Sequence, residues 1–213
     1  MTYKLSPHSL NLYVECKRCF YEDLVNKVKR PSGPFPSLPS GMDLIIKKRF
    51  DEFRGEKILP PEINSLEGLS LFTDDILKEW RNQRKGMLWN LDKDSLTGSV
   101  DEILQATNGN LVVMDYKTRG FPLKDTPTYY KLQLDLYNLM LRKNGYETEE
   151  YSLLLFFYPD SFNKDGSVKF NNTIVNFPVD VESAEKTFRD AIKLLNGRKP
   201  RASKECKFCE LKK

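Results

Sequence analysis

Four cysteines constrain the fold of this chain more than any other feature, because they form two C-x₂-C pairs near its opposite ends. Cys16 and Cys19 make up the first pair, Cys206 and Cys209 the second, and the 213 residues contain no other cysteine. Each pair is spaced to chelate one centre, and together they supply the four thiolates of a single metal site. A chain folded around such a site must bring its two ends together. Paired motifs of this kind are typical of structural zinc, and the alternative is four unrelated buried thiols.

The rest of the sequence indicates a protein of the cytoplasm. The N-terminal residues Met1–Leu5 lack the apolar segment of a secretory signal, and no stretch approaches the roughly 20 apolar residues of a membrane span. We therefore expect no contact with a membrane, and reduced thiols that act as metal ligands rather than disulfides. The net charge of +4 permits a polyanionic partner without requiring one.

The patterning of apolar residues predicts one mixed α/β (α+β) domain over residues 1–213. A helical part at 6–90 would precede an α/β core at 95–196 and a cysteine tail at 200–213. Helices are expected from Ser6-Pro7 to Phe20, from Ser40-Gly41 to Arg54-Gly55, and over 76–81, 126–143 and 181–195, with a proline-rich loop at 31–40. Strands are expected at 98–104, 111–117, 151–158 and 169–179, forming a mixed central β-sheet flanked by helices.

Two of the expected strands carry acidic residues toward one end of the sheet. A tight turn joins these strands, so Asp101 and Asp115 can lie on neighbouring strands. Asp115 and Lys117 are two residues apart, and their side chains should therefore project from the same strand face. Tyr116 would point the opposite way, but its backbone carbonyl could still ligate a metal.

The position of Asp115 makes it more informative than an isolated Asp-x-Lys, which is common on protein surfaces. It directly follows the apolar run 111–114, where a buried strand would normally continue with apolar residues. A buried carboxylate costs free energy unless it has a partner or a metal. Asp101 and Asp115 could hold Mg²⁺ or Mn²⁺, and Lys117 could orient an attacking water or stabilise charge in phosphodiester hydrolysis.

Three motifs follow one another along the chain, namely Gly98-Ser-Val-Asp101, Asp115-Tyr-Lys117 and Gln133-Leu-Asp-Leu-Tyr137. In this order they resemble the RecB-type branch of the PD-(D/E)XK nuclease superfamily, which includes the CRISPR-associated adaptation exonuclease and related iron–sulfur exonucleases. The resemblance covers about residues 6–210, and it implies a restriction-endonuclease-like core and metal-dependent cleavage of DNA. Asp101 and Asp115 would be metal ligands and Lys117 the catalytic lysine, while Gln133 and Tyr137 would contact the site or the DNA backbone from one helical face.

One departure from this family concerns an early histidine. Relatives place a metal-binding histidine four residues after a glycine on the second helix, but Gly41-Met-Asp-Leu-Ile45 puts Ile45 there. Asp43 could replace it as a carboxylate ligand, or could be a first-turn residue favoured by the helix dipole. The only histidine, His8, lies at a helix start and is expected on the surface. A binding protein without efficient catalysis is therefore an alternative function.

The resemblance also bears on the cysteine site. In the iron–sulfur relatives one cysteine comes from an early helix, followed by an aromatic-rich stretch like Cys19-Phe-Tyr21, and three come from the C-terminal tail. This tail holds two cysteines, and Cys19 would fill the vacancy. The resemblance thus implies a 4Fe–4S cluster, whereas the spacing alone is typical of structural zinc.

Basic residues concentrate in the N-terminal part of the chain and could contact nucleic acid. Backbone contacts from lysine and arginine, with stacking on Tyr13, Tyr21 and Trp89, would suit single-stranded DNA or duplex ends. Ordinary solvated helix faces are the equally common alternative. The expected contacts are Lys47, Lys48, Arg49, Arg84 and Lys85.

Together these features predict a metal-dependent DNA nuclease, namely an exonuclease for single-stranded or end-containing DNA in repair, recombination or CRISPR adaptation. Two alternatives use the same fold. One is a nucleic-acid-binding protein with weak or absent catalysis, and the other is a metal-stapled subunit of a protein complex.

Overall fold

The computed structural model describes residues 2–33 and 36–210, and at its centre lies a five-stranded mixed sheet with the order β2-β5-β6-β7-β8. β6 and β7 pair in parallel, and the other neighbours are antiparallel. The middle strand, β6, is buried on both faces, which explains its uninterrupted apolar run. The strands are β2 (Leu69–Leu71), β5 (Glu102–Ala106), β6 (Leu111–Thr118), β7 (Tyr151–Phe162) and β8 (Val168–Pro178).

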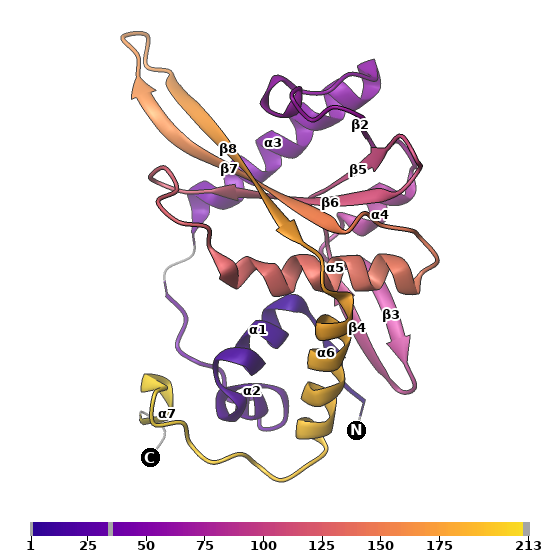
Figure 1. Ribbon diagram of the computed structural model, residues 1–213. Coiled ribbons are helices and arrows are strands. Elements are labelled where there is room, and N and C mark those ends of the chain that lie inside the picture. The colour runs from indigo at the N-terminus through magenta and orange to yellow at the C-terminus, as the bar shows by residue number, and fades with distance from the viewer. Residues whose placement is uncertain (1, 34–35, 211–213) are drawn as a thin grey trace.

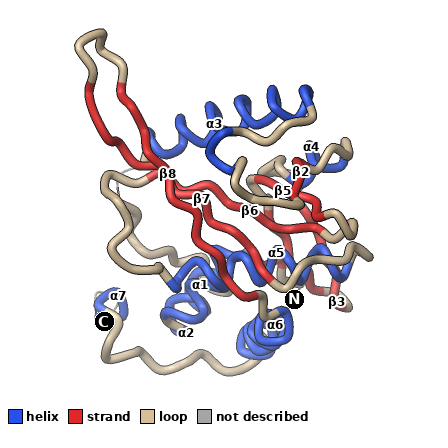
Figure 2. The backbone as a smooth tube through the Cα atoms, turned by 45° about the horizontal axis from the view of Figure 1, so that its top comes forward, coloured by secondary structure: helices blue, strands red, loops and turns tan. Residues whose placement is uncertain are grey.

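Helices cover both faces of this sheet (Figures 1 and 2). On one face, α3 (Ser37–Glu56) buries Ile46 and Phe50 against Val112 and Met114 of β6. On the other face lies α5 (Lys131–Lys143), backed by α1 (Pro7–Glu15), α2 (Lys17–Leu24) and α6 (Val181–Leu195). Because side chains alternate along a strand, Asp115 points to the α5 side. The predicted mixed sheet flanked by helices is thus confirmed.

A second, three-stranded sheet was not expected from the sequence. Its order is β1-β4-β3, with β1 at Lys4–Leu5, β3 at Met87–Leu91 and β4 at Asp94–Gly98. It ties the N-terminus to the core, and the Asp94 carboxylate accepts a hydrogen bond of 2.7 Å from the backbone N–H of Tyr3. The prediction of one strand at 98–104 is therefore wrong, because Gly98 ends β4 and β5 begins only at Glu102.

The predicted first helix is broken at Cys16. The backbone there is extended (φ −159°, ψ 103°), and the break separates α1 from α2. The thiol of Cys16 accepts a hydrogen bond of 3.5 Å from the backbone N–H of Cys19, so the cysteine that ends one helix caps the next. The two cysteines thus lie at a helix junction rather than along one continuous helix.

The second helix begins at Ser37, earlier than the predicted Ser40-Gly41, and the loop expected at 31–40 is correspondingly shorter. Pro39 falls within the first turn of α3. A proline is tolerated there because its missing N–H would have no partner within the helix.

Most remaining elements lie near their predicted positions, but the helix predicted over 126–143 begins only at Lys131, and β2 was not predicted. α4 (Ile76–Trp80) and α6 lie where expected, and a 3₁₀ turn at Thr128–Tyr130 precedes α5. β7 runs beyond its predicted end and forms with β8, an edge strand, a hairpin that projects from the sheet (Figure 1). A 3₁₀ turn at Pro61–Ile63 and α7 (Lys207–Glu210) complete the elements, and 211–213 of the predicted cysteine tail lie outside the described residues. Within the described part of the chain, no helix has the length and apolar character to cross a membrane.

Candidate active site

The end of β6 carries Asp115 and Lys117 on the face that looks toward α5. Asp115 is 1% exposed, and the ammonium of Lys117 forms an ion pair with its carboxylate. The strand period predicted this common direction, and the structure has the two side chains in contact. A carboxylate buried so deeply needs such a partner, since an unpaired buried charge is strongly destabilising.

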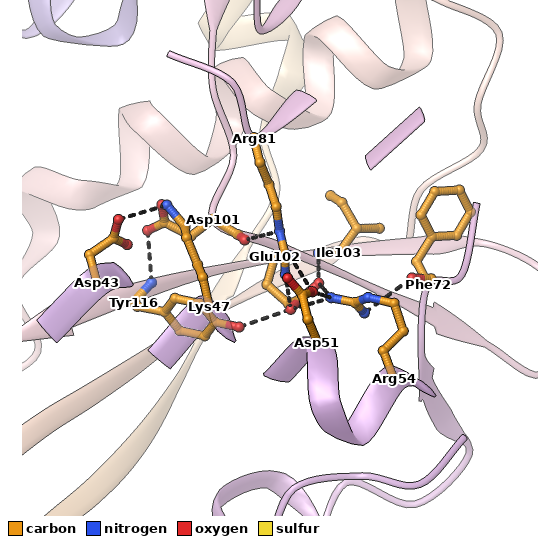
Figure 3. Close-up of polar contacts among 10 residues, drawn as sticks. All are labelled: Asp43, Lys47, Asp51, Arg54, Phe72, Arg81, Asp101, Glu102, Ile103 and Tyr116. Atoms are coloured by element: carbon orange, nitrogen blue, oxygen red, sulfur yellow. Dashed lines mark hydrogen bonds and ion pairs between the residues drawn. The ribbon is translucent and has the colours of Figure 1, made fainter. Parts of the chain in front are cut away.

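Asp101 lies in the short irregular segment between β4 and β5. One oxygen of its carboxylate accepts a hydrogen bond of 3.1 Å from the backbone N–H of Tyr116, and the other lies 2.7 Å from the ammonium of Lys47 (Figure 3). The side chain of Tyr116 points to the opposite face, as expected for a strand neighbour of Asp115. Asp101 thus reaches the end of β6 from a loop rather than from a paired strand position.

Gln133 and Tyr137 lie one helical turn apart on α5 and complete the site from the other side. The side-chain amide of Gln133 donates to the Asp115 carboxylate at 3.1 Å and to the Tyr137 hydroxyl at 2.8 Å. Its oxygen lies 3.5 Å from the ammonium of Lys117. All five residues of the three motifs therefore meet in one region. A further residue, Tyr130, places its ring centroid 4.9 Å from the same ammonium.

Helix α3 contributes Asp43 and Lys47 to the same region, one turn apart. The Lys47 ammonium lies 2.9 Å from an Asp43 carboxylate oxygen and 2.7 Å from one of Asp101, so it bridges the two acids. Ile45, at the position where the resemblance to the RecB-type branch predicts a histidine, is 64% exposed. Sequence reasoning treated Lys47 as a DNA contact and missed this pairing, because the register between helix and sheet is a tertiary property.

The other predicted DNA contacts lie farther out. Lys48 and Arg49 are exposed on α3, and Arg49 lies 3.2 Å from Glu62 and packs over the ring of Phe53. Arg84 and Lys85 lie in the exposed turn between α4 and β3. These four residues stay predicted contacts, whereas Lys47 belongs to the carboxylate site.

The buried charges shift the ionisation of the site. Burial, followed by the negative charge of Asp101, raises the pKa of Asp115 to about 8, while Lys117 opposes this shift. Burial disfavours the charged form of Lys117, but the charges of Asp115 and Asp101 outweigh it and raise the pKa of the lysine. The pKa of Lys47 is raised in the same way, since the charges of Asp101 and Asp43 more than offset the effect of its burial. The region thus holds three acids and two ammonium groups.

Asp101 and Asp115 fit a divalent cation by their chemistry. Mg²⁺ and Mn²⁺ prefer carboxylate oxygens, and one or two such ligands suffice because Mg²⁺ keeps several waters. Asp43 does not join them at one point. In the described part of the chain only the four cysteines form a group of three or more ligands whose donor atoms converge within 4.8 Å. The Lys47 ammonium stands between Asp43 and Asp101.

A buried ionic cluster lies behind Asp101, centred on Glu102, which is 0% exposed (Figure 3). Both of its oxygens lie 2.8 Å from the guanidinium of Arg54, and it also receives hydrogen bonds from Arg81 and from the Tyr116 hydroxyl. Arg81 also donates to the backbone carbonyl of Asp101 at 2.8 Å. Sequence reasoning missed this cluster, although Glu102 directly precedes the apolar residues Ile103 and Leu104. A charged residue next to an apolar strand segment is the same signal that marked Asp115.

The four cysteines come together, so the prediction that they join the two ends of the chain is confirmed. Cys16 and Cys19 lie at the α1–α2 junction, and Cys206 and Cys209 lie at the start of α7 (Figure 1). All four are buried, and each is 8% exposed or less. Their thiols can hold a metal ion or a metal cluster.

An open cleft of about 400 Å³ borders Gln133 and Tyr137 on the side of α1. Its walls include Gln83 and Ser99, and the exposed His8 also lines it. The single histidine of the chain is therefore on the surface, as expected, but it faces a cleft that adjoins the acidic site.

Comparisons with known proteins identify the family of this chain. The crystal structure of SSO0001 is similar to 98% of this chain and 84% of that one, with 17% sequence identity and a TM-score of 0.48. Curated proteins gave no match. The family model of the PD-(D/E)XK nuclease superfamily matches residues 46–213, which include every residue of the three motifs. The chain therefore belongs to the PD-(D/E)XK nuclease superfamily.

Proposed function

We propose that this protein is a metal-dependent nuclease that hydrolyses phosphodiester bonds in DNA. The observation that carries the proposal is the contact of Asp115 with both Lys117 and Gln133 at the buried end of β6. A superfamily member that had drifted to a purely structural role would have little reason to keep a charged pair at a position that otherwise favours apolar residues.

In this proposal Asp101 and Asp115 hold one Mg²⁺ or Mn²⁺, with the backbone carbonyl of Tyr116 as a further ligand. The bound ion would polarise the phosphate and lower the pKa of a water molecule. Lys117 orients the attacking water or stabilises negative charge on the phosphate. Gln133 fixes the direction of the Asp115 carboxylate through its 3.1 Å hydrogen bond, and Tyr137 holds Gln133 in turn.

The substrate strand would approach along the cleft that Gln133 and Tyr137 border. Its wall residues Ser99 and Gln83 offer uncharged hydrogen-bonding groups, while Lys48 and Arg84 offer charge for phosphates outside it. The resemblance to the RecB-type branch supports an exonuclease on single strands or duplex ends, acting in DNA repair, recombination or CRISPR adaptation. Linear and covalently closed circular DNA of the same sequence distinguish exonuclease from endonuclease activity, because an exonuclease degrades only the linear form.

The test of the proposed function compares wild type with Lys117→Ala on labelled single- and double-stranded DNA with Mn²⁺. Loss of the lysine is expected to lower the cleavage rate by about a hundredfold or more, the scale for one charge-stabilising group. Lys186→Ala is the matched control, since this lysine is exposed on α6. Equal cleavage by wild type and Lys117→Ala would reject the assignment.

A second function, DNA binding with weak catalysis, has one specific observation in its favour. Lys47 pairs with Asp101, which leaves less negative charge for a divalent ion, and Ile45 replaces the family histidine. Binding of labelled DNA without cleavage in Mg²⁺, Mn²⁺ or Co²⁺ would select this alternative. Binding to a protein partner with no affinity for DNA would instead favour a subunit of a complex.

A further inference from the structure

We propose that the four cysteines bind a single tetrahedral zinc ion rather than the 4Fe–4S cluster that the resemblance to iron–sulfur exonucleases implies. The inference does not depend on the proposed nuclease activity, because the cysteines lie apart from the acidic site and their ligand geometry alone carries it.

The separations of the sulfur atoms are those of one ion. The Sγ atom of Cys209 lies 3.5 Å from that of Cys16 and 3.9 Å from that of Cys19. Cys19 and Cys206 are 3.7 Å apart, and all four sulfurs lie within 4.8 Å of one another. A tetrahedral ion with zinc–sulfur bonds of about 2.3 Å holds its four sulfurs about 3.8 Å apart. Three of the six sulfur–sulfur separations are therefore close to the edge of a tetrahedron of this size, and none exceeds 4.8 Å.

A cubane cluster requires a wider cage. Its four irons form a tetrahedron of their own, and each thiolate extends outward from a different iron, so the thiolate sulfurs stand roughly 6 Å apart. Widening the sulfur–sulfur separations of the four buried cysteines to this distance would move α7 away from the α1–α2 junction. The side chains around the site, Leu12 and Phe208, pack directly against the cysteines and leave the site small.

The local backbone also has the form of a metal knuckle at each pair. Cys16 interrupts the helix so that its sulfur can accept the N–H of Cys19, and the backbone N–H of Cys209 donates to the carbonyl of Cys206 at 2.8 Å. Each tight turn aims its two sulfurs at the same point. Two such turns facing each other produce one four-coordinate centre.

The guanidinium of Arg30 lies beside the cysteine site and can offset part of the negative charge of its thiolates. Four thiolates around one Zn²⁺ carry a net charge of −2, which needs partial neutralisation in a buried site. The guanidinium of Arg30 lies 3.5 Å from the sulfur of Cys206, packs over the ring of Phe208 at 4.6 Å, and pairs with Glu15 at 2.6 Å. Arg30 thereby ties the segment after α2 to both ends of the chain.

The decisive experiment measures the metal in the full-length protein. The chain is expressed in medium supplied with both iron and zinc, purified without oxygen, and analysed for Zn, Fe and acid-labile sulfide together with its visible spectrum. One zinc per chain and a colourless solution are expected. Four irons and four sulfides per chain, with broad brown absorbance, would overturn the proposal, as would a protein that contains neither metal.

Reconstitution gives an independent reading of geometry. Metal-stripped protein titrated with Co²⁺ should bind one equivalent and develop the intense visible bands of a tetrahedral thiolate site, and one Zn²⁺ should displace it. Incubation of the stripped protein with Fe²⁺ and sulfide should give no stable cluster. The inference would be contradicted if an iron–sulfur cluster formed and raised the melting temperature of the stripped protein as much as zinc does.

Two variants separate this site from the acidic one. Cys206→Ser should lower the bound zinc well below one equivalent, and Lys117→Ala should keep one equivalent whether or not the protein cleaves DNA. If Cys206→Ser is insoluble, Arg30→Met serves instead, with weaker zinc retention against a chromophoric chelator as the expected result. Unchanged zinc retention in Cys206→Ser, or in Arg30→Met where that variant replaces it, would refute the assignment.

Discussion

The ammonium of Lys47 lies 2.7 Å from a carboxylate oxygen of Asp101, one of the two acids proposed to hold a divalent ion. The same ammonium lies 2.9 Å from Asp43, so one lysine of α3 pairs with two of the three acids near the end of β6. A cation that enters must compete with this lysine for Asp101. The lysine, once displaced, would be close enough to contact a bound phosphate.

Replacing this lysine should therefore strengthen metal binding. Lys47→Met keeps the length of the side chain but removes the competing charge, and we expect Mn²⁺ to bind several-fold more tightly in the absence of DNA. Calorimetric titration of wild type and variant measures the change. Lys48→Met, which alters the exposed neighbour, should bind Mn²⁺ like wild type. Weaker or unchanged binding by Lys47→Met would show that the lysine does not compete.

Metal binding should also depend steeply on pH. Burial and the charge of Asp101 raise the pKa of Asp115 to about 8, so ionisation of this acid, and with it the ion pair with Lys117, is incomplete at neutral pH in the metal-free protein. An incoming ion must displace the proton of the un-ionised acid, and Mn²⁺ affinity should fall by up to about tenfold for each pH unit below 8. Titrations at pH 7 and pH 9, in buffers with different ionisation enthalpies, measure the affinity and the proton released. A pH-independent affinity would be incompatible with this picture.

The same shift predicts how the stability of the metal-free protein depends on pH. The folded-state pKa of Asp115 is raised, so between about pH 4 and 8 the folded chain holds a proton that the unfolded chain has lost. Its contribution to stability is present at low pH and is lost as the pH rises through 8. Asp115→Asn removes the titration, and its melting temperature relative to wild type should therefore increase from pH 5 to pH 8.5. A constant difference across this range would exclude Asp115 as the cause.

The sequence was sufficient to place Asp115 and Lys117 together because strand periodicity is a local property. It failed for Asp101, which was assigned to the middle of a strand but lies in an irregular segment. That segment exists because β4 belongs to a separate three-stranded sheet. The local sequence pattern does not predict which sheet a short strand will join. The fold class was nevertheless predictable, since helices and strands were read correctly over most of the core.

The ion pairs between α3 and the sheet escaped prediction for a different reason. Lys47 and Arg54 both lie on the helical face near the sheet, yet one reaches Asp101 and the other Glu102. Which acid each basic residue meets depends on the height and rotation of the helix over the strands. The apolar residues that set this rotation, Ile46 and Phe50, were visible in the sequence, but their partners on β6 were not.

Arg81 should matter for catalysis beyond its part in stability. Arg54 and Arg81 both pair with the buried Glu102, but only Arg81 also holds the backbone carbonyl of Asp101. Arg54→Met and Arg81→Met should each destabilise the fold by about 1–3 kcal/mol, because each leaves a buried carboxylate with fewer partners. Only Arg81→Met should also lower the rate constant for DNA cleavage at a temperature where both variants are folded. Arg81→Lys should restore part of that rate, and equal rates in the two methionine variants would assign Arg81 a purely structural role.

The glycine of the first motif should be intolerant of any side chain. A Cβ atom at Gly98 would lie 2.9 Å from a ring carbon of Tyr137 and 3.0 Å from the terminal methyl of Met140, so β4 approaches α5 as closely as it does because Gly98 has none. Gly98→Ala should cost about 1–3 kcal/mol of stability through overpacking. It should also push Tyr137 away from Gln133 and so lower the rate of DNA cleavage.

Two further variants distinguish this steric effect from a general sensitivity to alanine. Gly120→Ala should be neutral, since nothing lies within 4 Å of a Cβ placed there. Truncation of the flexible neighbour, in Gly98→Ala combined with Met140→Ala, relieves the contact with Met140 and should leave the clash with Tyr137. Urea unfolding and cleavage rates of all three variants measure the outcome. If Gly98→Ala is as stable and active as Gly120→Ala, close packing of β4 on α5 is not what requires a glycine in this motif.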